Sequence, residues 1–154
     1  MEIVDLLRPE AVKVVSTVSS KKVLLHTVAD LAGQCYGIDP ETSVRALQDR
    51  EALGPTAVGH GVALPHARIE GLQDVCAVFM RLDKPIDFGA MDRKPVDLFF
   101  GLLAPETAGV EHLKALALVS RTMRDPSVCD KIRANSDADT VYTILTAAQR
   151  QQAA

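Results

Sequence analysis

Apolar residues recur along this chain at two different spacings, and the change from one spacing to the other predicts its elements. In residues 24–35 they return every three or four positions, which is the spacing of an amphipathic helix. Ser19 or Ser20 is suited to cap the start of this helix, and Gly37 is suited to end it. In residues 75–80 and 97–103 the apolar run is continuous, which is typical of strands covered on both faces.

Further helices follow from the same spacing and from residues that favour helix ends. Asp39 and Pro40 open a helix that stops at Leu53-Gly54-Pro55. His112 falls in the first turn of another helix, with Thr107 or Gly109 as its expected cap. The remaining helical pattern covers residues 113–123, 128–132 and 141–145, the last preceded by a capping-box sequence at Ser136–Asp139.

Helices around buried strands predict a layered α/β fold. Lys84-Pro85 and Lys94-Pro95 mark a loop or a short edge hairpin between the two strands. We expect one domain over residues 1–150 and a frayed tail over 151–154, the fraying extending back to Gln149.

Composition and charge narrow the functional classes. The chain has 154 residues, of which 47% are hydrophobic and 24% charged, and its net charge is −3. No run of Lys or Arg forms a basic stripe, which argues against nucleic-acid binding. No apolar run has the length of a membrane span, and the acidic start is not a signal peptide. Three separated cysteines in apolar segments suit a reducing compartment, so we expect a cytoplasmic protein.

The segment 59–68 carries the candidate chemistry. Gly59 and Gly61 are able to bring backbone N–H groups close to an anion, because they lack a Cβ and tolerate positive φ. Pro65 restricts the chain around it, so that His66 is presented in a defined direction, and Arg68 adds a cation. An aimed imidazole beside a cation and bare amides suits phosphoryl chemistry on histidine.

A phosphorylated histidine needs hydrogen-bond donors for its oxygens. The candidates are the backbone of 59–61, together with the side chains of Arg50, Arg68 and His112. A helix N-terminus disfavours an imidazolium and attracts an anion, which would keep His112 neutral. The spacing alone leaves open whether His112 meets His66, and His112 is alternatively a locally packed helix-start residue.

Other residues of this set have plainer interpretations. His60 stands between two glycines, and its plainer interpretation is a loop histidine that faces water. Arg50 and Arg68 are alternatively surface charges, and His26 is interpreted as structural. Val58, Val62 and Leu64 belong either to the core or to an apolar docking patch around His66.

The motif Gly59-x-Gly61-x-Ala63-x-Pro65-His66 resembles the active-site signature of type-2 (fructose/mannitol) IIA domains of the bacterial phosphoenolpyruvate phosphotransferase system. The likeness covers roughly residues 3–145, which makes it far more specific than a lone glycine motif. The short N-terminus and the absence of fused transporter domains resemble the stand-alone nitrogen-regulatory branch. The flanking matches, in order, are Leu47-x-x-Arg50-Glu51, Pro95-Val96-Asp97-Leu98 and His112-Leu113.

The resemblance implies a three-layer α/β/α domain around a mixed sheet. It implies that His66 is transiently phosphorylated by an HPr-like protein, with His112 and Arg50 supporting the phosphoryl group and no cofactor bound. Gly59, His60, Gly61, Pro65 and Arg68 would complete the site. The sequence departs from the family pattern at His60, where asparagine is common, and at Ala67, where glycine is frequent.

The same resemblance implies a regulator whose targets depend on its phosphorylation state. Control of nitrogen-related transcription, of potassium transport or of sensor kinases is the expectation for that branch. The alternative within the family is a sugar-transport IIA component that passes the phosphoryl group to a IIB component.

Two other classes compete. Residues 54–59 have the glycine spacing of a P-loop, but His60 and Gly61 stand where the lysine and the Ser/Thr are required, so we reject a nucleotide site. A metal-binding protein using His60, His66 and His112 is the alternative of a different class. It lacks an H-E-x-x-H motif and a carboxylate at a ligand offset.

Overall fold

A computed structural model of the chain describes residues 1–153, with side chains through residue 147. The two helices before the glycine motif begin and end as predicted. Helix α2 (Lys21–Tyr36) is capped by the Ser20 side chain, which accepts the Val23 N–H, and it ends at Gly37 in the left-handed conformation. Helix α3 (Pro40–Ala52) is capped by Asp39, which accepts the Thr42 N–H.

The helices after the strands differ from the prediction mainly at their starts. Helix α4 (Gly109–Met123) has Ala108 as N-cap, without a side-chain bond, rather than Thr107 or Gly109. Helix α5 (Pro126–Arg133) is capped by Asp125. Helix α6 (Ala138–Ala153) is capped by Asp137, which accepts the Thr140 N–H, so the predicted Ser136 capping box does not form. The helix runs through most of the predicted tail; Ala154 lies outside the described residues.

The strands form one mixed sheet in the order β1-β5-β6-β3-β2, with β4 also paired to β6. The hairpin of β5 and β6 is antiparallel, whereas β1 is parallel to β5, and β3 and β4 are parallel to β6. Strand β6 is buried almost throughout, as its continuous apolar run predicts. The strand bounds are β1 (Leu7–Val15), β2 (Ala57–Gly59), β3 (Val62–Ala63), β4 (His66–Ile69), β5 (Cys76–Ile86) and β6 (Val96–Pro105).

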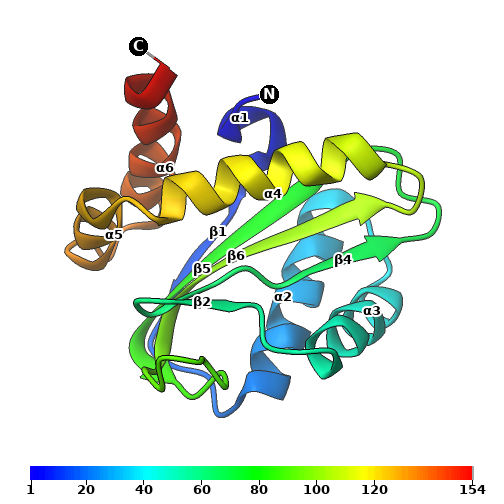
Figure 1. Cartoon of the computed structure of the whole chain (residues 1–154), viewed down its shortest axis with the longest axis horizontal. Helices are drawn as coiled ribbons and strands as arrows, with labels where there is room; N and C mark the ends of the chain where they lie inside the picture. Colours follow the sequence, from blue (N-terminus) through cyan, green and yellow to red (C-terminus); the bar gives the residue numbers. More distant parts are fainter. Residues whose placement is uncertain (154) are drawn as a thin grey trace.

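Helices cover both faces of the sheet, which confirms the three-layer α/β/α fold (Figure 1). Helices α2 and α3 lie on one face, while α4 crosses the other, where α6 and the short α1 (Ile3–Leu6) also lie. Four phenylalanines form edge-to-face pairs in the core between the layers, Phe79 with Phe100 and Phe88 with Phe99. The site therefore has a rigid support, because β6 is packed on both faces.

Strand β1 was not predicted. Its residues 8–10, Arg-Pro-Glu, are exposed, and its register with β5 shifts between Leu7 and Val12. Proline has no N–H for the ladder, and edge strands tolerate it. The exposed residues 8–10 and the register shift interrupt the alternation of apolar and polar positions from which a strand is predicted.

Candidate active site

His66 is the first residue of β4, where it pairs with Leu102 of β6. The Pro65 carbonyl accepts the Leu102 N–H at 2.9 Å, which fixes the chain directly before the histidine. His66 Nδ1 lies 2.8 Å from the Leu64 carbonyl oxygen. Because a carbonyl only accepts, this bond assigns the hydrogen to Nδ1 and leaves the lone pair on Nε2.

His112 is the fourth residue of α4, and its ring meets the ring of His66. The two ring centroids are 5.6 Å apart and the planes cross at 68°. His112 is only 6% exposed, and its Nε2 has no hydrogen-bond partner among the residues that the structure describes. A buried polar nitrogen without a partner is uncommon, and this one belongs to the ring that meets His66.

The surroundings of both rings favour the neutral form. Burial lowers the pKa of His66, the bond to the Leu64 carbonyl opposes that effect, and the nearby Arg50 adds to it. Burial also lowers the pKa of His112, with further lowering from His66 and Arg68. Neutral imidazole is the nucleophilic form, so the electrostatics suit attack by the free Nε2 of His66.

Two arginines act electrostatically on this pair of histidines. Arg50, in the last turn of α3, donates to the Gly54 carbonyl at 2.8 Å. Arg68 is exposed and donates to the Glu106 carbonyl at 3.3 Å. Their effects on the pKa of His66 and of His112, respectively, place both cations within electrostatic reach of the rings.

The glycine motif divides into two parts in space. Residues 59–61 form the turn between β2 and β3, where the His60 N–H donates to Asp92 at 3.0 Å and its carbonyl accepts from Arg133 at 2.8 Å. Val62 pairs with position 98 of β6 and His66 with position 102, a separation of about 13 Å at about 3.3 Å per residue. The structure thus brings the rings of His66 and His112 together, with Arg50 and Arg68 within electrostatic reach, and leaves Gly59, His60 and Gly61 in a separate turn.

The same separation bears on the metal alternative. His60 lies in the distant turn, whereas His66 and His112 share one site. Among the described side chains, no group of three or more His, Cys, Asp or Glu is arranged to hold a metal ion.

Prediction from the sequence missed two contributors. The Leu64 carbonyl orients His66, and Glu51 was noted only as part of the family motif. Glu51 is buried one helical turn after the buried Leu47, on the same side of α3. A charged residue on the apolar face of a helix was the available signal.

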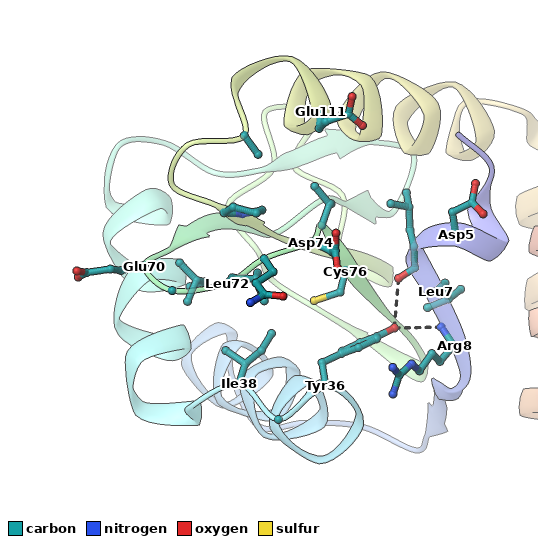
Figure 2. Close-up of a pocket in the computed structure, with 18 of the residues that line it drawn as sticks. Asp5, Leu7, Arg8, Tyr36, Ile38, Glu70, Leu72, Asp74, Cys76 and Glu111 are labelled. Carbon is teal, nitrogen blue, oxygen red and sulfur yellow. Dashed lines mark hydrogen bonds between the residues drawn. The ribbon is translucent and has the colours of Figure 1, made fainter.

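A pocket of about 1000 Å³ lies next to this site, between the C-terminal end of α2, the β4–β5 connection and the start of α4 (Figure 2). None of the predicted site residues lines it. Tyr36, which lines it, accepts the Arg8 N–H at 3.0 Å and lies 2.7 Å from the Ala77 carbonyl oxygen. Burial raises the pKa of Tyr36 to about 12, so its hydroxyl stays protonated and bonded within the protein.

The fold agrees with what comparisons with known proteins find. The family model described as "Phosphoenolpyruvate-dependent sugar phosphotransferase system, EIIA 2" matches residues 5–148. The chain therefore belongs to the type-2 EIIA family of this phosphotransferase system. No helix among the described residues has the length and apolar character needed to span a membrane.

Within this family, the chain is similar to proteins named for nitrogen regulation. It is 47% identical to a nitrogen regulatory protein of Bradyrhizobium diazoefficiens over 94% of this chain and 95% of that protein. The crystal structure of nitrogen regulatory protein IIA-Ntr from Neisseria meningitidis matches with a TM-score of 0.86 and 34% identity, over 92% and 97% of the two chains. A fructose-specific EIIA component of Haloferax volcanii is 31% identical over 94% and 90%.

Proposed function

We propose that this protein is a phosphocarrier that accepts a phosphoryl group on Nε2 of His66 from a phosphorylated HPr-like protein. The observation that carries this proposal is the bond from His66 Nδ1–H to the Leu64 carbonyl. It leaves the Nε2 lone pair of His66 free, next to the ring of His112, whose own Nε2 has no partner among the described residues. Family membership supports the same chemistry.

The transfer is a direct displacement between two imidazoles. The Nε2 lone pair of His66 forms the new bond to phosphorus, and the donor's phosphorus–nitrogen bond breaks with its electron pair returning to the donor ring. His66 keeps its Nδ1 hydrogen, and the Leu64 carbonyl accepts a stronger bond from the ring as it gains positive charge. No proton has to move, and no cofactor takes part.

Donors around His66 stabilise the phosphoryl oxygens. His112 offers an N–H, and Arg50 and Arg68 supply positive charge without a further proton transfer. Because these groups already balance the charge, the transfer needs no magnesium. Supplying the upstream components as phosphoproteins in the presence of a chelator tests this point, since a loss of transfer would contradict it.

Apolar side chains beside the site provide a docking surface for the HPr-like partner. Val110 and Leu113 flank His112 on α4 and are 65% and 66% exposed. Val58 of β2 is also exposed, whereas Val62 and Leu64 belong to the core. Exposed apolar groups next to a reactive residue are typical of a protein interaction site.

The relatives named for nitrogen regulation support a regulatory role. Phosphorylation adds about −1.5 to −2 charge on hydroxyl residues, and a comparable change at His66 would alter which proteins bind this face. The protein would act in the cytoplasm on targets such as potassium-transport proteins or sensor kinases. The similarity to a fructose-specific EIIA component supports the alternative, a sugar-transport component that passes the phosphoryl group to a IIB protein.

Intact-mass spectrometry tests the proposal. The protein is incubated with phosphoenolpyruvate, enzyme I and its native HPr-type carrier, and we expect one acid-labile phosphoryl adduct. His66→Ala should carry none, while His26→Ala, a change at an exposed histidine of α2, should be labelled as the wild type. An unlabelled wild type with a phosphorylated native carrier would refute the role. Subsequent loss of the adduct to a IIB protein would favour the transport alternative.

A further inference from the structure

Glu51 is an acidic side chain that lies out of solvent close to the histidine site. Its side chain is 5% exposed. Because an ionised carboxylate is costly to bury, it requires partners that replace water. Glu51 has three: the Lys21 ammonium at 2.8 Å, the Thr56 N–H at 3.1 Å and the Thr56 hydroxyl. Both carboxylate oxygens are therefore occupied, which leaves Glu51 without a free atom for substrate.

A continuous series of hydrogen bonds leads from this carboxylate to His66. Thr56, held by Glu51 at its N–H and its hydroxyl, accepts the Leu64 N–H on its carbonyl at 3.0 Å. The Leu64 carbonyl in turn accepts the His66 Nδ1–H at 2.8 Å. Thr56 and Leu64 are each 5% exposed, so water does not compete along this path.

The backbone before His66 is held on one side by β6, through the Pro65 carbonyl, and on the other by Thr56, through the Leu64 N–H. Pro65 has no N–H, so Leu64 is the last residue before His66 whose amide can be anchored. Strand β3 contains only two residues, and Leu64 follows it directly. Lys21 ties the carboxylate to the first turn of α2, and it also lies 3.3 Å from the Phe88 carbonyl and 4.4 Å from the Phe88 ring centroid.

We propose that Glu51 is a positioning residue for phosphoryl acceptance: through Thr56 it fixes the Leu64 carbonyl, which keeps the hydrogen of His66 on Nδ1 and the lone pair on Nε2. This inference rests on the proposed phosphocarrier function of His66. Without the fixed carbonyl, neutral His66 divides between its two tautomers, and only one of them presents Nε2 to the donor.

Glu51→Gln in the full chain tests the relay. Glutamine keeps the size of the side chain but loses the ion pair with Lys21 and one acceptor oxygen. Two-bond ¹H–¹⁵N spectra of labelled histidine, at a pH where His66 is neutral, should show the Nδ1–H form in the wild type and a shift toward Nε2–H in the variant. Transfer at saturating donor should slow about tenfold, with little change in the half-saturating donor concentration, because Glu51 is buried.

Two control pairs separate positioning from general destabilisation. Asp83→Asn removes a carboxylate that pairs with Arg81 at 2.6 Å, away from this path, and should change neither the tautomer nor the rate. Thr56→Val, which loses the hydroxyl, should shift the tautomer as Glu51→Gln does, whereas Thr56→Ser should resemble the wild type. If Glu51→Gln does not fold, the Thr56 pair decides.

An unchanged tautomer in a folded Glu51→Gln variant, whether or not its rate falls, would overturn the inference, as would a Thr56→Val variant equal to Thr56→Ser. The spectra need no phosphoryl donor. A wild type that is never labelled would therefore refute the proposed function, while the tautomer measurement would still decide the role of Glu51.

Discussion

The rings of His66 and His112 meet edge to face, with centroids 5.6 Å apart, although the residues belong to a strand and to a helix on one face of the sheet. Burial lowers the pKa of each ring, and the neighbouring His66 lowers the pKa of His112 further. Both effects favour neutral rings. One ring offers a lone pair, and the other has a nitrogen that nothing in the described structure occupies.

Replacing His112 should slow phosphoryl transfer without preventing it. In His112→Ala the nucleophile keeps its tautomer, because the Leu64 carbonyl still holds Nδ1–H, but one donor to the phosphoryl oxygens is lost. We expect a decrease of about tenfold or more in the initial rate of labelling. His112→Gln, which retains an N–H donor, should recover part of the rate. Unchanged labelling kinetics in His112→Ala would remove this residue from the site.

Arg50 should contribute through its charge. Arg50→Met removes the cation near His66 and the bond to the Gly54 carbonyl, so the transfer rate should fall about tenfold. Arg45→Met is the matched control, since Arg45 is exposed on the same helix. Stopped-time labelling with the native carrier measures both variants. Equal rates for the two would show that Arg50 serves only as a surface charge.

The two histidines also predict how stability depends on pH. Their pKa values are lowered in the folded protein, whereas an unfolded histidine titrates near 6.5. As the pH falls through 6.5, the unfolded chain binds protons that the folded chain does not, so stability present at pH 7 is lost below that value. The loss should reach at most about 1.4 kcal/mol per pH unit for each histidine.

Urea unfolding between pH 7 and pH 5 measures this loss. A variant with both His66→Gln and His112→Gln should show a flatter dependence than the wild type over that range. Carboxylates titrate mainly at lower pH and contribute less within the window. An equal slope in the double variant would show that the two rings do not carry the linkage.

The sequence predicted those parts of the fold that depend on local chemistry. The predicted helix ends are formed by side chains that cap, Ser20 and Asp39, and by a glycine in the left-handed conformation, Gly37. The N-cap of α4 was not predictable, because Ala108 has no capping side chain. Asp137 rather than Ser136 caps α6, and two adjacent residues able to cap give no local basis for choosing between them.

The sequence indicated which residues belong to the candidate site, but not how they lie relative to one another. The resemblance to a family motif indicated His66, His112 and Arg50, but their proximity depends on strand register and on how α4 packs over β6. The glycines of the motif were expected to bind the phosphoryl group because they adjoin His66 in sequence. Consecutive residues of an extended chain are about 3.3 Å apart. The glycines, which precede β3, therefore lie far from His66, which begins β4.

Gly61→Ala tests where the motif's glycines act. Gly61 has φ of +77°, and an added Cβ would lie 2.6 Å from Arg133 Nη2 and 3.0 Å from Asp97 Oδ1. Arg133 donates to both oxygens of Asp97 and to the His60 carbonyl, so the substitution disturbs the contacts that hold this turn. We expect a loss of about 1 to 3 kcal/mol in the free energy of unfolding. Phosphorylation of His66 should remain, because the turn lies far along β6.

Gly71→Ala is the matched control, since Gly71 has φ of +83° and no heavy atom within 4 Å of its added Cβ. It shares the strained backbone conformation without the collision, so its cost should be about 1 kcal/mol. The difference between the two variants in chemical unfolding then reports the contacts around Arg133. A folded Gly61→Ala protein that cannot be labelled would instead mean that the glycine turn takes part in binding the phosphoryl group, as its place in the sequence first indicated.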